Sequence, residues 1–194
     1  MFYMGLDLGQ RRDHSAIAVV ERSEALPPWQ GLAPRELRLR LVERVPLGTP
    51  YPAVVERVKA IATSARVKGD LRLAVDATGV GAPVVDLLRT ARLGFEVTAV
   101  TMTGGERATN AGSRWNVPKR DLMAGVQVLL ERGELRIARG MRDTPALIRE
   151  LMDVRASTRS AEGGGEHDDL VVAVALACWR AKWTRNQVGQ NGWY

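Results

Sequence analysis

Aspartate interrupts two of the most apolar stretches of this sequence. Asp7 lies within the run MGLDLG (residues 4–9), and Asp76 closes the run LRLAVD (residues 71–76). Short apolar runs of this kind predict buried strands, and aspartate is depleted in strands. A carboxylate is almost never fully buried unless it is paired or bound to a metal ion. The two aspartates therefore predict a chemical site at the ends of two strands.

A third acidic position opens a helix. Asp168 and Asp169 follow His167 and precede the apolar run LVVAVALACW (residues 170–179). The helix dipole favours carboxylates at this place in any protein, so the pair alone is a weak signal. Beside the two strand aspartates, it predicts a hard-cation site with oxygen ligands. Adjacent helical residues point ~100° apart, so we expect Asp168 as the direct ligand, Asp169 as a second one, and His167 as a cap or a solvent-facing residue.

The composition indicates a single α/β domain. The chain has 194 residues, of which 45% are hydrophobic, enough for a sizeable core. No apolar run approaches the ~20 residues of a membrane span, and the first residues lack the basic region of a secretory signal. The single cysteine, Cys178, excludes an internal disulfide and is expected to be a buried structural thiol. The expected location is the reducing cytoplasm, that of the host cell if the chain is viral.

The net charge of +6 gives weak support for a nucleic-acid partner. Arginine outnumbers lysine 24 to 4, and guanidinium groups bind phosphate bidentately. A GC-rich or thermophilic genome explains the arginine preference equally well. The candidate DNA contacts are Lys119 and Arg120 at a predicted loop–helix junction, together with Arg11 and Arg12 in the turn after the first strand.

The order of the predicted elements constrains the topology. Strands are expected at residues 2–8, 15–21, 36–43, 71–76, 95–101 and 134–138, helices at 52–68, 82–92, 118–132, 144–155 and 168–183, and loops at 26–34 and 156–166. Three antiparallel strands followed by alternating helices and strands resemble the RNase H-like (retroviral-integrase-type) fold. That α/β fold has a central mixed five-stranded sheet with helices on both faces. In it, Asp7 and Asp76 lie toward the carboxyl ends of their strands, where ligands bind in open α/β sheets.

Four motifs resemble those of the phage terminase large-subunit nuclease domain, within the RNase H/RuvC-like superfamily. They are the acidic runs GLDLG (residues 5–9), VDATGVG (75–81) and HDDL (167–170), and the lysine-bearing helix start VPKRDL (117–122). The resemblance covers about residues 3–183, and the order and spacing of the motifs make it fairly specific. It predicts one nuclease domain over residues 1–185 and a flexible tail over 186–194.

The family resemblance implies an activity. In that family the domain cuts concatemeric double-stranded DNA during genome packaging, with two Mg²⁺ or Mn²⁺ ions held by the acidic cluster. We expect Asp7 to bridge the ions, Asp76 to complete one site and Asp168, with Asp169, to complete the other, because two ions serve both the attacking and the leaving oxygen. Little sequence preference is expected, since no DNA-recognition motif is present.

Further partners follow only if the chain is part of a terminase. They would be a packaging ATPase domain, the portal and the small terminase. The sequence contains no GxxxxGK[ST] segment, so the resemblance implies cleavage and says nothing of translocation. The chain is then either an excised nuclease domain or a free-standing relative.

Two other functions remain open. A RuvC-type Holliday-junction resolvase shares the fold and the aspartate pair at the last helix, but its second acid is usually glutamate, where Asp76 stands here. From another class, the run DLG (residues 7–9) followed by AIAVV (16–20) resembles the first phosphate loop of actin-like sugar kinases. Those proteins need two lobes and would not require the aspartate pair at residues 168–169. Nucleotide binding separates the kinase reading from both nuclease readings.

Overall fold

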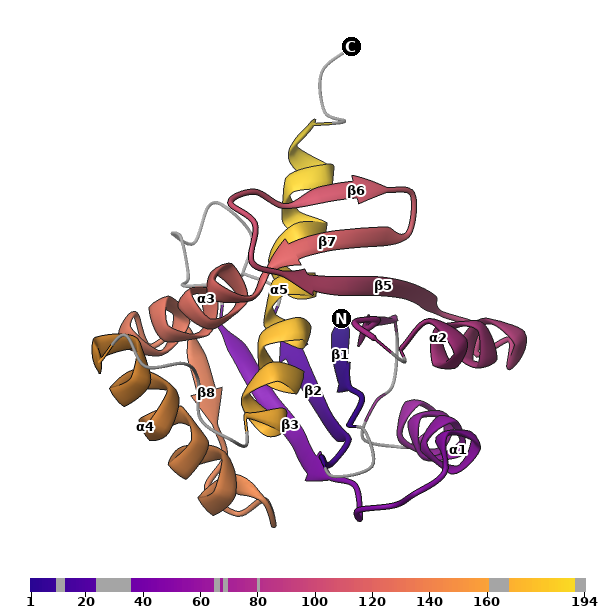
Figure 1. The fold of residues 1–194 in the computed structure, drawn as a ribbon, viewed down its shortest axis with the longest axis horizontal. Helices are drawn as coiled ribbons and strands as arrows, with labels where there is room; N and C mark the ends of the chain where they lie inside the picture. The colour runs from indigo at the N-terminus through magenta and orange to yellow at the C-terminus, as the bar shows by residue number, and fades with distance from the viewer. Residues whose placement is uncertain are drawn as a thin grey trace.

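A computed structural model describes residues 1–9, 13–23, 36–64, 67, 70–79, 81–160 and 168–190, with the side chains of 156–160 and 183–190 excepted. In the described part, one mixed sheet of eight strands runs in the order β6-β7-β5-β4-β1-β2-β3-β8 (Figure 1). The strands are β1 Phe2–Asp7, β2 Ala16–Arg22, β3 Leu37–Arg44, β4 Leu71–Asp76, β5 Glu96–Thr103, β6 Thr109–Ala111, β7 Arg114–Pro118 and β8 Leu135–Ile137.

The topology confirms the predicted fold and corrects its strand count. Strand β1 lies inside the sheet, antiparallel to β2 and parallel to β4, as expected. The sheet has eight strands instead of five, because β8 joins the edge beside β3 and the hairpin β6–β7 extends the other edge. This hairpin was not predicted. Residues 109–111 are all exposed, so they carry no alternating apolar pattern to indicate a strand.

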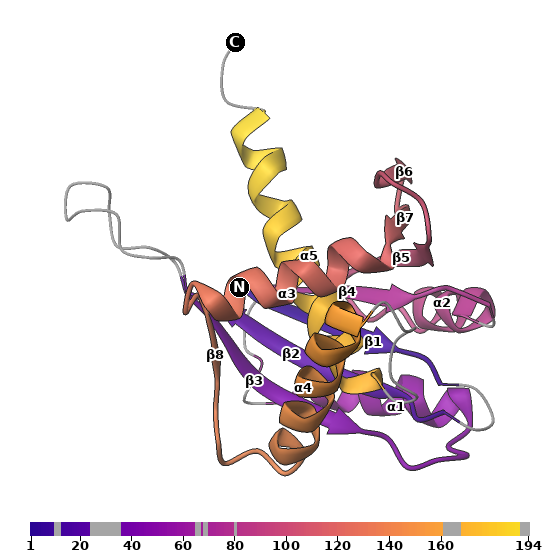
Figure 2. The ribbon, with the colours of Figure 1, turned by 60° about the vertical axis from the view of Figure 1, so that its left-hand side comes forward.

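Within the described ranges, five helices cover the two faces of the sheet (Figure 2). They are α1 Tyr51–Ala62, α2 Gly81–Thr90, α3 Lys119–Glu131, α4 Thr144–Ser160 and α5 Asp169–Gln190. One hydrophobic core lies under α5, α3 and α4, and a second lies under α1 and α2. Helix α1 ends six residues before the predicted boundary. Helix α4 continues to Ser160, so the first five residues of the predicted loop at 156–166 are helical.

Helix α5 packs directly on the central strand. Its first three turns are buried on every side, as expected for a helix that is apolar all round. The close approach depends on Gly5 of β1. A Cβ at that position would lie 1.9 Å from the carbonyl oxygen of Ala173 and 2.8 Å from the nitrogen of Ala177. Glycine in the first acidic motif therefore fixes the distance between β1 and the helix that carries Asp169.

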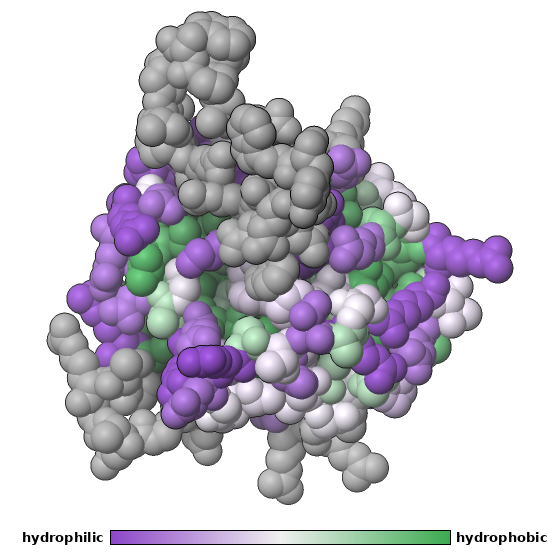
Figure 3. All heavy atoms as spheres, turned by 90° about the horizontal axis from the view of Figure 1, so that it is seen from above, coloured by the Kyte–Doolittle hydropathy of each residue, from purple (hydrophilic) through white to green (hydrophobic). Residues whose placement is uncertain are grey.

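The buried thiol of Cys178 was predicted correctly. Burial raises the pKa of this thiol to about 12, so it stays protonated and serves as a packing residue. On the outside, the face shown in Figure 3 has hydrophilic side chains around smaller apolar areas. Across the described ranges, no helix combines the length and the hydropathy needed to cross a membrane. The loop expected at 26–34 lies outside the described residues.

Candidate metal centre

Two aspartates meet at one end of the sheet. Strands β1 and β4 are parallel neighbours, and Asp7 and Asp76 each follow the last registered pair, Leu6 and Val75. Side chains alternate along a strand, and Tyr3 of β1 and Ala74 of β4 belong to the core under α5. Asp7 and Asp76 therefore lie on the face that α5 covers. Both are buried, with 8% and 6% of their surface exposed.

Helix α5 brings two more carboxylates to the same place. The pKa of Asp7 is raised well above its usual value, first by burial and then by the charges of Asp76, Asp169 and Asp168. The positive charge of Lys119 opposes this rise. The other three acids of the sequence prediction thus all lie within electrostatic range of Asp7. Such a concentration of negative charge in a buried place is costly unless protons or cations neutralise it.

Local backbone contacts set the orientation of Asp76. Its Oδ1 accepts a hydrogen bond of 2.8 Å from the backbone N–H of Thr78. Burial raises the pKa of Asp76, whereas the Thr78 hydrogen bonds, a side-chain hydrogen bond with Asp7 and the charge of Lys119 lower it. Gly81 is required here as well, because a Cβ would lie 2.2 Å from the carbonyl oxygen of Asp76. Close packing at the start of α2 explains this glycine.

Asp168 and Asp169 differ in their surroundings. Asp168 Oδ2 forms an ion pair of 2.7 Å with Lys119 Nζ, and its side chain is 18% exposed. Asp169 is buried, and its Oδ2 has no hydrogen-bond partner among the described residues. Burial raises the pKa of Asp169, against the lowering effect of the Arg44 charge. The expectation that Asp168 is the preferred ligand remains a prediction, and Asp169 offers the unpartnered oxygen.

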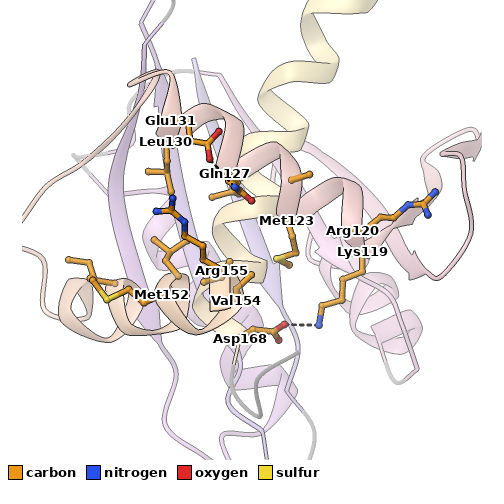
Figure 4. A pocket seen from close by; sticks show the side chains of 15 residues that line it. Lys119, Arg120, Met123, Gln127, Leu130, Glu131, Met152, Val154, Arg155 and Asp168 are labelled. Carbon is orange, nitrogen blue, oxygen red and sulfur yellow. Dashed lines mark hydrogen bonds and ion pairs between the residues drawn. The ribbon is translucent and has the colours of Figure 1, made fainter. Parts of the chain in front are cut away.

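The predicted DNA contacts lie beside this centre. Lys119 and Arg120 begin α3, and the Arg120 side chain is 64% exposed. Figure 4 shows Lys119 extended toward Asp168 at one end of a cleft between α3 and α4. The cleft has a volume of about 670 Å³ and a mainly apolar wall that includes Met123 and Met152. Arg11, Arg12 and His167 lie outside the described residues.

The donor set fits a hard divalent cation. Among the described residues, no three His, Cys, Asp or Glu side chains converge as closely as the ligands of a bound ion. Four carboxylates repel one another, and Lys119 holds Asp168 by an ion pair, so a cation would draw the set together. The buried, unpartnered Oδ2 of Asp169 and the raised pKa of Asp7 fit an oxygen-liganded Mg²⁺ or Mn²⁺.

Four residues near the centre were not predicted from the sequence. Arg44 and Glu150 form an ion pair beside the start of α5. Asp13 and His14, in the turn between β1 and β2, act electrostatically on Asp169, where Asp13 raises its pKa and His14 lowers it. Asp13 and His14 belong to the same polar turn as Arg11 and Arg12, the predicted DNA contacts. The position of this turn directly after Asp7 could have indicated that they lie near the site. The sequence around Arg44 and Glu150 offers no such signal, because each has charged neighbours in the sequence, a pattern that indicates exposed positions.

The comparisons with known proteins concern the fold. No protein-family model and no curated protein matches the sequence. Among solved structures, the Mn-soaked human cytomegalovirus terminase nuclease domain matches with a TM-score of 0.55 and 13% identity, over 91% of this chain and 82% of that chain. The same domain with an inhibitor bound matches with a TM-score of 0.54 and 15% identity, over the same shares. At this level of identity, the likeness confirms the predicted RNase H-like fold and nothing finer.

A resolvase structure also matches. Thermus thermophilus RuvC aligns over 96% of both chains with 18% identity, at a TM-score of 0.47. This score is too low to favour one function over another. The function must therefore be argued from the residues of this chain.

Proposed function

We propose that this protein is a metal-dependent endonuclease that hydrolyses phosphodiester bonds of double-stranded DNA. One observation carries the proposal: two buried aspartates at the ends of adjacent parallel strands face two more at the start of α5. The pKa of Asp7 is raised by burial and by the charges of Asp76, Asp169 and Asp168. Four such carboxylates destabilise the fold when charged, and a bound cation would remove that cost. The Mn-soaked cytomegalovirus domain, which has the same fold, supports a divalent ion.

The proposed ligands are Asp7, Asp76, Asp168 and Asp169. Asp7 is central, because its carboxylate senses the charges of all three others, and it is our choice for the shared ligand of two Mg²⁺ or Mn²⁺ ions. When bound, such ions activate the attacking water and stabilise the leaving oxygen of a phosphodiester. The protein supplies the geometry through β1, β4 and the first turn of α5. The Thr78 backbone N–H fixes one carboxylate oxygen of Asp76.

Basic side chains at the start of α3 would orient the DNA. Lys119 lies at the edge of the carboxylate cluster and lowers the pKa of both Asp7 and Asp76. Its ammonium group is thus placed to contact a phosphate oxygen next to the reacting bond. Arg120 is exposed beside it, paired weakly with Asp121 and the carbonyl oxygen of Glu106, and is placed to contact the next phosphate. Contacts of this type position DNA without reading its sequence, so we propose cleavage with little sequence preference.

The terminase-like reading of this nuclease is the preferred one. It accounts for aspartate at position 76 and for the lysine at the start of α3. On this reading the partners are double-stranded DNA and, in a packaging complex, an ATPase domain, the portal and the small terminase. A RuvC-type resolvase needs the same fold and metal site, so the DNA substrate must distinguish the two.

Cleavage assays on three DNAs test the proposal. Supercoiled plasmid, linear duplex and a synthetic four-way junction are incubated with Mn²⁺, Mg²⁺ or EDTA. We expect plasmid nicking and linearisation, similar rates on linear duplex and junction, and no turnover in EDTA. The Asp7→Asn variant should fold and bind DNA but not cleave it, because the substitution removes the central charge at constant shape.

Each alternative function has its own signature in these assays. Symmetric incision of the junction with linear duplex left intact would identify a resolvase. ATP binding without any nuclease activity would support the sugar-kinase reading. Cleavage at the wild-type rate by a folded Asp7→Asn protein would eliminate the proposed metal site.

A further inference from the structure

Glu150 of α4 is a buried acid outside the predicted ligand set. Only 5% of its surface is exposed. Its Oε2 accepts hydrogen bonds from the backbone N–H groups of Leu170 (2.9 Å) and Val171 (3.1 Å). These N–H groups belong to the first turn of α5, which has no intrahelical partner for them. Glu150 therefore anchors the helix start immediately after Asp168 and Asp169.

The other carboxylate oxygen of Glu150 forms an ion pair with an arginine. Arg44, the last residue of β3, donates from its Nη2 to Glu150 Oε1. Arg44 is opposite Ala16 of β2, and Ala16 is opposite Asp7 of β1. The guanidinium group thus belongs to the same row across the sheet as the central carboxylate.

Arg44 and Asp169 are close but not bonded to each other. Arg44 lowers the pKa of Asp169 through its charge. Nevertheless, Asp169 Oδ2 and Arg44 Nε are both buried and have no hydrogen-bond partner among the described residues. An acceptor and a donor of opposite charge would pair if Arg44 turned toward α5. In the structure the guanidinium group is turned toward α4, where it is bonded to Glu150.

We infer that Glu150 is a positioning residue that holds Arg44 away from Asp169, which leaves the Asp169 carboxylate available to the metal ion. The inference rests on the proposed metal site. It gives the Arg44–Glu150 pair a role beyond capping α5. Residues that orient metal ligands from the next shell typically change metal affinity by about 10–100-fold when they are replaced.

Substitution of Glu150 with glutamine separates this role from the cap. The amide oxygen still accepts hydrogen bonds from the backbone of α5. The amide carries no charge, however, and its NH₂ group is a hydrogen-bond donor that cannot accept from the guanidinium group. Arg44 should then turn to Asp169 and compete with the metal. Removal of Arg44 in the same protein should abolish that competition.

Mn²⁺ affinity in a double-mutant cycle tests the inference, with calorimetry or electron paramagnetic resonance of free Mn²⁺ as the readout. Glu150→Gln should weaken Mn²⁺ binding about tenfold. Arg44→Met should bind Mn²⁺ at least as tightly as the wild type, and Arg44→Met combined with Glu150→Gln should return to within about threefold of it. Circular dichroism and thermal melting establish that each variant is folded.

A matched control breaks a different Arg–Glu pair. Glu21, which pairs with Arg40 at the opposite end of the sheet, is replaced by glutamine and should leave Mn²⁺ affinity unchanged. If Glu150→Gln does not fold, Glu150→Asp serves instead, because its shorter carboxylate withdraws from Arg44 and keeps the charge at the α5 cap. It should weaken binding in the same direction.

The outcomes separate the inference from the proposed function. Wild-type protein that binds no Mn²⁺ would overturn the metal site and, with it, the inference. Wild-type protein that binds Mn²⁺ while Glu150→Gln binds equally well would overturn the inference alone. Equal weakening in Glu150→Gln and in the double variant would also overturn it, because the loss would then come from the cap and not from Arg44.

Discussion

Replacement of Gly5 with alanine should separate α5 from the central strand. The new Cβ would lie 1.9 Å from the carbonyl oxygen of Ala173, and the shortest ordinary contact of a Cβ is 3.4 Å. The helix must therefore shift by about 1.5 Å, because the obstacle is backbone and has no side-chain rotamer to change. The shift moves Asp168 and Asp169 away from Asp7, since both acids stand at the start of the same helix.

Two magnitudes follow from this displacement. Overpacking of a core costs about 1–3 kcal/mol of unfolding free energy, which for a chain of this size lowers the Tm by roughly 2–12 °C. Displacement of catalytic groups by about 1 Å can reduce a rate about 100-fold. We therefore expect the Gly5→Ala protein to remain folded, to melt earlier and to cleave plasmid about 100-fold more slowly in Mn²⁺. Thermal melts and plasmid linearisation rates give both numbers.

Gly125 provides the control for this experiment. It lies in the middle of α3, and a Cβ there would meet nothing within 4 Å. Gly125→Ala should stabilise the protein by about 0.5–1 kcal/mol through helix propensity and leave the cleavage rate unchanged. The reasoning fails if Gly5→Ala melts and cleaves like the wild type, or if both variants lose activity equally.

Three further predictions concern charge and reactivity. In EDTA, Asp7→Asn should raise the Tm at neutral pH. The pKa of Asp7 is raised in the folded protein. The unfolding free energy of the wild type therefore falls as the pH rises above about 4, the usual pKa of an aspartate. Melts from pH 4 to 8 should show the advantage shrinking toward acid, and a constant difference would contradict the raised pKa. Lys119→Ala combined with Arg120→Ala should weaken DNA binding and flatten its salt dependence by roughly two phosphate contacts, whereas an unchanged slope would assign both residues to a solvated surface. Cys178, whose thiol has a pKa of about 12, should resist iodoacetamide in the native protein and react only on unfolding, as mass spectrometry would show.

Most of the fold could be predicted because buried strands and helices place apolar residues at regular spacings in the sequence. Strands β1 and β4 are continuous apolar runs, and β3 alternates from Leu37 to Leu41, so each was located within a residue or two. The hairpin β6–β7 shows no such spacing, because its outer strand is exposed throughout. Its pairing depends on the neighbouring strand β5, which is a tertiary contact that a local pattern does not contain.

The acids of the candidate site were predictable for a related reason. A carboxylate in an apolar run is conspicuous, and Asp7 and Asp76 both stand in one. The difference between Asp168 and Asp169 was not predictable, because it arises from partners distant in sequence. Lys119 of α3 pairs with Asp168, and the packing of α5 buries Asp169.

Arg44 and Glu150 show where local patterns fail. Arg44 ends the charged segment RLRLVER of β3 (residues 38–44), whose other arginines, Arg38 and Arg40, are exposed. Only the approach of α4 makes the last arginine different, by placing a buried glutamate against it. The start of α5 is consequently held from three directions: Gly5 admits the helix to β1, Glu150 caps its free N–H groups, and Lys119 restrains Asp168. A shift in any one of these contacts moves the carboxylates of α5 relative to Asp7, so the proposed metal site depends on residues that never touch the metal.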